Sequence, residues 1–170
     1  MSKNSNIKLI SASIDDELLL VELMKKYHLY DGIEMTDEDR LAALRPLLSS
    51  SEKGNVWIIC LGSKQIGYIA TCNCYSIEFR GIEVWIDEFY IDEQCRGQGF
   101  GSEILEKVKS FLKSQGAAIV HLEVDENNPK AEITYKQVDN NEIEIDHTGV
   151  SDELGGQGLG TKLVDAVVEH

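Results

Sequence analysis

The stretch RGQGFGS (residues 96–102) places three glycines at alternate positions, after a strand-like segment and at the start of a segment with helical spacing. The first N–H groups of a helix have no partner within the helix, and glycines leave them accessible because no Cβ blocks the approach. An anionic oxygen can come close to such a turn, and the helix dipole adds to the attraction. The stretch therefore predicts a pyrophosphate-binding turn in preference to a tight turn of purely structural purpose.

Two other phosphate-binding motifs do not fit these residues. A Rossmann turn has the spacing G-x-G-x-x-G after a first strand, whereas Gly97, Gly99 and Gly101 follow four predicted strands. An acid, Glu123, does lie on the next predicted strand, but no second crossover follows it. A P-loop is excluded because the chain contains no Gly-Lys-Ser or Gly-Lys-Thr.

The whole chain predicts an α/β fold, in which an antiparallel meander is joined to one β-α-β crossover. Alternating polar and apolar residues indicate strands, and a spacing near 3.6 indicates helices. Thr36, three residues before Asp39, is a helix N-cap signal, and Pro46 is expected to kink or end that helix. The predicted order is strand 7–13, helix 15–30, the helix after Thr36, strands 56–61, 66–75 and 82–91, helix 102–114, and strand 117–124. A hairpin turn that begins at Gly62 is expected to join the second and third strands, and Gly116 is expected to stop the last of these helices.

This order and three short motifs resemble the GCN5-related N-acetyltransferase (GNAT) family. Arg96, Gly99 and Gly101 match the family's acyl-CoA-binding motif R/Q-x-x-G-x-G/A. GYIA (67–70) and NNPKAEITY (127–135) look like two further landmarks, the second with the pattern N-x-x-A-x-x-x-Y. The resemblance implies a mixed, mostly antiparallel sheet flanked by helices, with acetyl-CoA as co-substrate.

The resemblance covers residues 5–135 and implies where acetyl-CoA would bind. The pantetheine arm would pair like an extra strand with the backbone of Phe89, Tyr90 and Ile91, and Asn128 would hydrogen-bond to the arm. The pyrophosphate would lie on backbone N–H groups of the turn, which consists of Arg96, Gly97, Gln98, Gly99, Phe100, Gly101 and Ser102. No metal is expected in this site.

The same resemblance implies direct attack of an amine on the acetyl thioester, so the protein must remove a proton and stabilise the departing thiolate. Glu88 is the candidate base, acting through water, and a solvated strand carboxylate is the alternative interpretation. Glu78 is a weaker candidate of the same kind. Tyr135 matches the family tyrosine that protonates the thiolate, although a strand tyrosine packed by its ring would give the same pattern. The acceptor would be a small amine or a lysine.

A second glycine-rich turn, GGQGLGT (155–161), repeats the first. A shift of 59 residues, from Ile86 to Ile145, overlays 82–111 on 141–170. The second turn begins with Gly155 in place of Arg or Gln, which weakens it as a CoA site. Residues 131–170 resemble part of a smaller GNAT-like branch, so we expect a core at 1–130 joined to a partial second unit at 131–170. An artificial chimera is favoured over a natural fusion.

About 40 residues bury too little surface to fold alone, so the tail from residue 131 should pack on the first unit as one domain. We expect residues 131–147 to add antiparallel strands to the sheet, and a helix from Thr161 to pack on it. This β-β-turn-α segment would replace the family's usual final helix and strands. Exchange of the tail with a second chain, giving a homodimer, is the alternative.

Composition and charge restrict the partners and the compartment. The net charge of −14 argues against nucleic acid, whose phosphates need basic contacts. The same acidity suits a cationic acceptor or serves solubility alone. No signal peptide or membrane-spanning stretch is recognised, and four cysteines then indicate free thiols in the cytoplasm. Cys72 and Cys74 have the spacing of neighbours on a strand, which is favoured over a zinc site.

Three classes of function remain open from the sequence. The first is an active N-acetyltransferase, and the second is a module that binds acetyl-CoA without turnover. The third is a chimera assembled to test folding, with no cellular function. Residues 17–45 and 132–150 would shape the acceptor site. They contain no motif that identifies the acceptor.

Overall fold

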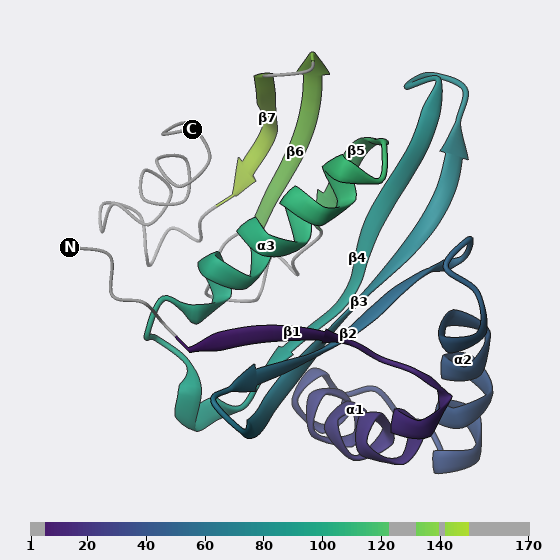
Figure 1. Ribbon diagram of the computed structural model, residues 1–170, viewed down its shortest axis with the longest axis vertical. Coiled ribbons are helices and arrows are strands. Elements are labelled where there is room, and N and C mark those ends of the chain that lie inside the picture. The colour runs from purple at the N-terminus through teal and green to yellow at the C-terminus, as the bar shows by residue number, and fades with distance from the viewer. Residues whose placement is uncertain (1–5, 123–131, 140–141, 150–170) are drawn as a thin grey trace. The chain divides into compact units, whose positions relative to one another are not determined.

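The computed structural model describes residues 6–122, 132–139 and 142–149 (Figure 1). These residues form two compact units. The first unit contains the chain up to residue 73 together with 87–107. The second unit contains residues 74–86 and the described residues from 108 onwards.

The first unit is built on four strands in the order β1-β2-β3-β4. Strands β1 and β2, and likewise β2 and β3, are antiparallel, and the two-residue turn 62–63 joins β2 to β3. A left-handed backbone at Gly62 (φ +64°) closes that turn. The strands are β1 (Ile7–Ser11), β2 (Gly54–Leu61), β3 (Lys64–Ser76) and β4 (Gly81–Ile91), of which the last two extend into the second unit.

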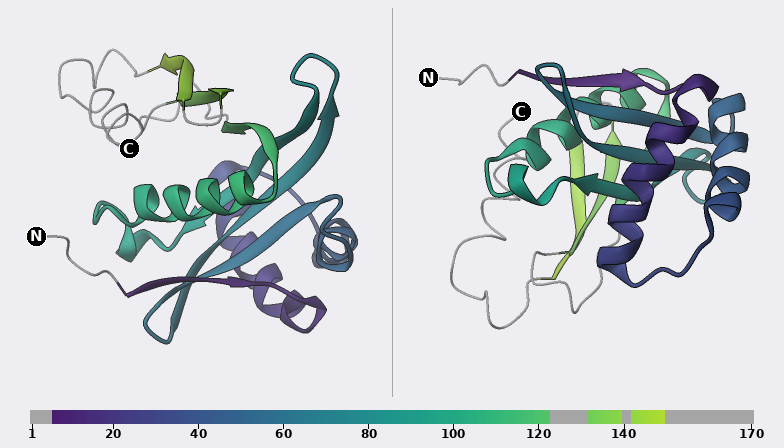
Figure 2. Two further views of the ribbon diagram at one scale, coloured as in Figure 1. Left: turned by 45° about the horizontal axis from the view of Figure 1, so that its top comes forward. Right: turned by 90° about the horizontal axis from the view of Figure 1, so that it is seen from below.

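Two helices lie on one face of these strands, as Figure 2 shows. They are α1 (Glu17–Asp31), preceded by the short 3-10 helix η1 (Ile14–Asp16), and α2 (Asp37–Ser49). One apolar cluster joins them to the sheet, and its buried members are Leu20, Leu23, Met24, Leu44, Val56, Ile58, Cys60, Tyr68, Ala70 and Tyr90. Trp57 and Ile59 alternate with these residues along β2 and are buried as well, so both faces of β2 are covered.

The predicted N-cap of α2 is confirmed, because Thr36 Oγ1 accepts a hydrogen bond from the N–H of Asp39 at 3.1 Å. Pro46 lies inside α2, and the helix continues to Ser49. The expectation that Pro46 ends this helix is therefore wrong. A proline removes one helical hydrogen bond, and three further residues still complete the last turn.

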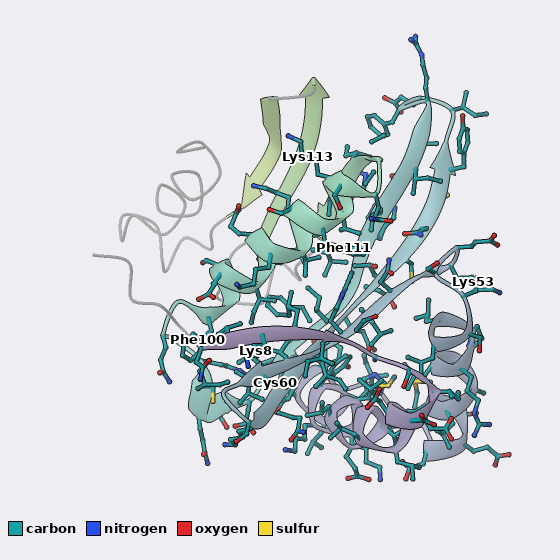
Figure 3. The ribbon with its side chains drawn as sticks, viewed as in Figure 1. Lys8, Lys53, Cys60, Phe100, Phe111 and Lys113 are labelled. Carbon is teal, nitrogen blue, oxygen red and sulfur yellow. The ribbon has the colours of Figure 1, made fainter. Side chains whose placement is uncertain are left out.

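The helix after the glycine turn is α3 (Phe100–Ser114), which follows the 3-10 helix η2 (Glu93–Cys95). It begins at Phe100, labelled in Figure 3, two residues before the predicted start. Gly116, with φ +83°, follows its end in the left-handed conformation that the predicted stop requires. The predicted order β-α-α-β-β-β-α-β is thus confirmed up to β5 (Ala117–Leu122).

The second unit continues the strand order as β4-β5-β6-β7. Strand β5 runs parallel to residues 82–86 of β4, as a β-α-β crossover requires. Strand β6 (Glu132–Asp139) pairs antiparallel with β5, and β7 (Glu142–Gly149) pairs antiparallel with β6. The predicted fold class, α/β with a mixed and mostly antiparallel sheet, is confirmed. The predicted addition of antiparallel strands to the sheet by the tail is confirmed as well.

The predicted helix from Thr161 and the second glycine turn lie outside the described residues. So does the predicted boundary at residue 131, and the division at 1–130 and 131–170 stays a prediction. Within the part of the chain that the structure describes, no helix is both long and apolar enough to cross a membrane.

Candidate functional site

The glycine turn is open where the sequence predicts an anion site. Gly97 and Gly99 have φ of +71° and +82°, and a Cβ built on either would meet no atom within 4 Å. The first hydrogen bond of α3 joins the N–H of Glu103 to the carbonyl of Gly99. The N–H groups of residues 100–102 therefore have no partner inside the helix and lie at its positive end. This geometry can receive an anionic oxygen.

The side chain of Arg96 does not extend into this open turn. Its Nε donates to the carbonyl of Ile91 at 2.8 Å, and its guanidinium carbon lies 4.8 Å from the ring centroid of Tyr30. The ring of buried Tyr90 lies on it as well, with the guanidinium carbon 5.6 Å from the ring centroid. Arg96 thus ties the start of the turn to the end of β4, which sets the position of the glycines that follow.

The remaining side chains of the predicted turn differ in exposure. Gln98 is exposed and donates from Nε2 to the carbonyl of Gln94 at 3.3 Å. Phe100 is half-buried, and Ser102 is exposed. A Cβ on Gly101 would lie 3.9 Å from Cδ1 of Ile91, an ordinary van der Waals contact. The chemistry of the turn therefore comes from its backbone.

The end of β4 offers a strand edge. The N–H of Asp92 donates to the carbonyl of Ile66 at 2.6 Å, and the carbonyl of Tyr90 lies against Gly67, both on β3. Because backbone groups alternate sides along a strand, those of Phe89 and Ile91 face away from β3. The described pairs between β4 and β5 end at Ile86, so they do not use these groups. Of the three residues predicted to meet the pantetheine arm, Phe89 and Ile91 have the matching orientation.

Glu88, also on β4, is held by two donors from different elements. Tyr68 on β3 donates its hydroxyl to Oε2 at 2.6 Å, and Nε2 of His28 on α1 lies 2.7 Å from Oε1. The Glu88 side chain keeps 18% of its surface exposed. A carboxylate has about four lone-pair sites, so two remain for a water or substrate.

A buried arginine completes this group. Nε of Arg40 on α2 donates to Nδ1 of His28 at 3.1 Å, and Nη1 of Arg40 donates to Asp37 at 3.1 Å. We call Glu88, Tyr68, His28 and Arg40 the carboxylate centre. It joins β4, β3, α1 and α2 by hydrogen bonds.

Two tyrosines beside Glu88 resist ionisation. Burial, and then the neighbouring Glu88 carboxylate, hold the pKa of Tyr68 well above its usual value. Burial and the carboxylates of Asp31 and Glu88 raise the pKa of Tyr27 to about 12. The Tyr68 hydroxyl therefore keeps its proton at neutral pH and remains a donor to Glu88.

His28, Arg40 and Tyr68 were not predicted from the sequence as members of a site. Leu20, Met24 and His28 are four residues apart and share the buried stripe of α1. Arg40 and Leu44 have the same relation on α2. The sequence therefore contained a signal, which is a polar residue on an otherwise apolar stripe of a helix. That signal does not identify the side chain to which the polar residue bonds.

Other predicted residues are not brought to this centre. Glu78 lies exposed in the turn between β3 and β4, where it has no buried partner network like that of Glu88. Tyr135 pairs with Val120 across β6 and β5, and its role stays a prediction. Asn128 lies outside the described residues. All four cysteines are free, and burial together with Asp87 raises the pKa of the Cys72 thiol.

The comparisons with known proteins agree with this geometry. A model of the acetyltransferase (GNAT) family matches residues 19–139, which is well over half of the chain. A second model, described as GCN5-related N-acetyl-transferase, matches residues 120–170. The two matches overlap around residue 131, where the sequence predicts a join.

Curated relatives match over part of their length. An uncharacterized N-acetyltransferase of Methanocaldococcus jannaschii is 31% identical over 103 residues, which are 58% of this chain and 44% of that protein. Thialysine N-epsilon-acetyltransferase of Mus musculus is 35% identical over 75 residues, 44% of either protein. The chain thus spans less than half the length of these relatives.

Solved structures share the fold. An integron cassette protein from the mobile metagenome of Cole Harbour Salt Marsh gives a TM-score of 0.65 at 27% identity, covering 70% of this chain and 77% of that one. A predicted acetyltransferase from Clostridium acetobutylicum, solved with acetyl-CoA, gives 0.60 at 19% identity, covering 69% and 80%. The matched family model, the element order and the open glycine turn agree, and the chain belongs to the acetyltransferase (GNAT) family.

Proposed function

We propose that this chain is an N-acetyltransferase that uses acetyl-CoA to acetylate an amine. The observation that carries the proposal is the open turn at Gly97 and Gly99, at the N-terminus of α3. The C. acetobutylicum structure of the same fold was solved with acetyl-CoA, which supports this choice of co-substrate.

The turn and the end of β4 would bind different parts of acetyl-CoA. The pyrophosphate would accept hydrogen bonds from backbone N–H groups between Arg96 and Ser102, where the helix dipole also favours its charge. The pantetheine amides would pair with the outward backbone groups of Phe89 and Ile91. The Ile91 carbonyl already accepts from Arg96, so the Phe89 carbonyl and both N–H groups remain for the arm.

Glu88 would remove the proton that the amine loses on attacking the thioester. Its two free lone-pair sites allow a water to bridge the carboxylate and the amine. The proton passes from the amine nitrogen through the water to Glu88, while the carbon–nitrogen bond forms and the carbon–sulfur bond breaks. Tyr135 is proposed as the acid that protonates the departing thiolate.

The acceptor is proposed to be a small aliphatic amine or a lysine-type side chain. The relatives from pig and mouse are named for thialysine, an amine of this class, and matches of 33% and 35% identity make it the first acceptor to test. The net charge of −14 would attract such cations over long distances. The four free thiols favour a reducing compartment, so the cytoplasm remains the proposed location.

A module that binds acetyl-CoA without turnover is the second candidate. The two overlapping family matches at 19–139 and 120–170 favour it. In a chain joined from two branches, the residues that line the acceptor side of the site would come from the second branch. We keep the chimera as a proposal on the same ground.

Two measurements test the proposal. Acetyl-CoA at millimolar concentration should raise the melting temperature, because a ligand that binds only the folded state stabilises it by mass action. Release of CoA thiol with a panel of amines, including thialysine, lysine and short diamines, should then identify turnover. A folded sample with no thermal shift contradicts acetyl-CoA binding, and a shift without thiol release selects the binding module.

A further inference from the structure

We propose that His28 and Arg40 are positioning residues for Glu88: Arg40 holds the ring of His28 through Nδ1, and His28 holds the carboxylate in one orientation. The inference rests on the proposed role of Glu88 in acetyl transfer. It gives a chemical purpose to two buried polar side chains that the acetyl-CoA site itself does not use.

The hydrogen bonds determine which ring nitrogen of His28 carries the proton. An arginine has donors only, and Nε of Arg40 points to Nδ1 of His28 at 3.1 Å. Nδ1 must therefore accept, and the ring proton lies on Nε2. That nitrogen lies 2.7 Å from Oε1 of Glu88, so the bond between the two runs from the imidazole N–H to the carboxylate.

Burial shows that these bonds are made away from water. His28 is 1% exposed and Arg40 is 7% exposed. Apolar side chains of similar volume would fill such positions at no loss of stability in many proteins, because burying polar groups requires desolvation. In the part of the chain that the structure describes, the ring of His28 bonds to Arg40 on one side and to Glu88 on the other, so the buried bonds lead to the carboxylate.

Two donors together restrict the carboxylate. Tyr68 binds Oε2 from β3, and His28 binds Oε1 from α1, so rotation of the carboxylate would break both bonds. A base that acts through a single water depends on such positioning, since a misplacement of about 1 Å can lower a rate 100-fold. Arg40 acts one step further away, because its Nε–H holds Nδ1 and so keeps the ring turned with Nε2 toward Glu88.

Steady-state kinetics test the role of the histidine. His28→Leu removes both bonds and should lower kcat for acetyl transfer roughly 10- to 100-fold, with KM for acetyl-CoA changed less than about twofold. His28→Gln keeps a donor and an acceptor at a similar spacing and should recover most of kcat. Thr71→Val is the matched control. It removes the hydrogen bond that the hydroxyl of buried Thr71, on β3, accepts from the Asn55 N–H, and it should lower the melting temperature without changing kcat per folded molecule.

A double-mutant cycle separates positioning from folding. If His28 acts through Glu88, His28→Leu should cause no further loss of kcat in a Glu88→Gln background. Equal fold-losses in both backgrounds would overturn the proposal. A full loss of kcat in His28→Gln would do so too. Acetyl-CoA binding without turnover by the wild-type chain would overturn both the positioning role and the assignment of Glu88.

A spectroscopic measurement tests the arginine without any turnover. Side-chain 15N resonances of His28 should show the Nε2–H tautomer in the wild-type chain, and the Nε2 resonance should broaden in Arg40→Met, because the ring is no longer held at Nδ1. An Nδ1–H tautomer in the wild type, or no change in Arg40→Met, would overturn this part. Since acetyl-CoA is absent from this experiment, its outcome is independent of the thermal shift that tests the proposed function.

Discussion

The glycine turn at residues 97–101 and the carboxylate centre differ in the atoms that carry their chemistry. The turn offers backbone N–H groups, and its glycines matter because they leave those groups uncovered. The carboxylate centre consists of side chains from four elements, and the bond from His28 to Glu88 joins residues 60 positions apart. The comparison shows that local sequence can specify a backbone site, whereas a side-chain site needs the fold to assemble it.

The largest effect should come from the carboxylate centre. Glu88→Gln keeps the size of the side chain but removes the base, so kcat should fall about 10²- to 10⁴-fold. The thermal shift with acetyl-CoA should remain, because the turn is unchanged. Thiol release with the best amine of the panel measures the first quantity. A variant with wild-type kcat would mean that Glu88 has a structural role only, and the carboxylate centre would then not be a catalytic site.

The next effect should come from the turn. Gly99→Val places a side chain over the N–H groups and should abolish the thermal shift with acetyl-CoA. Gly116→Val is the matched control, because Gly116 has nearly the same φ (+83° against +82°) and the same empty surroundings. Both variants bear the strain of a left-handed valine, but only Gly99→Val should lose binding. Equal loss of the shift in both would show that strain, and not access to the backbone, controls binding.

A smaller effect should appear in the stability of the folded chain at high pH, through the tyrosines beside the carboxylate centre. The pKa of Tyr27 is raised to about 12 in the folded chain, against about 10 in an unfolded one. The folded state therefore holds this proton more tightly, and the associated stability is complete below pH 10 and is lost as the pH rises toward 12. Urea unfolding between pH 9 and 12 measures the decline, which should be shallower in Tyr27→Phe. An identical decline in that variant would assign the effect elsewhere.

The smallest effect should come from the second glycine turn. Gly158→Val should leave the thermal shift with acetyl-CoA nearly intact, because that turn begins with Gly155 where the family motif has Arg or Gln. In the first turn, Arg96 ties the glycines to the end of β4 through the Ile91 carbonyl, and the second turn has no such side chain. A loss equal to that of Gly99→Val would show that the two turns act together.

Particular elements show where sequence-based prediction succeeded and where it did not. The capping box at Thr36, the turn after Leu61 and the stop at Gly116 depend on neighbouring residues, and the structure has all three. Pro46 was expected to kink or end its helix, and it does not end it, because the loss of one hydrogen bond leaves the remaining turn in place. The start of α3 was predicted two residues too late, because glycine and phenylalanine are weak indicators of a helix start.

The sequence by itself determined the α/β order, the family and the position of the glycine turn. These depend on residues within a few positions of each other, where periodicity, capping and the absence of a Cβ act directly. Only the tertiary structure decided which donors hold Glu88 and why Arg40 and His28 are buried. It also showed which backbone groups of β4 face an open edge. Those contacts join residues far apart in the chain, and their chemistry exists only when packing brings the polar groups together without water.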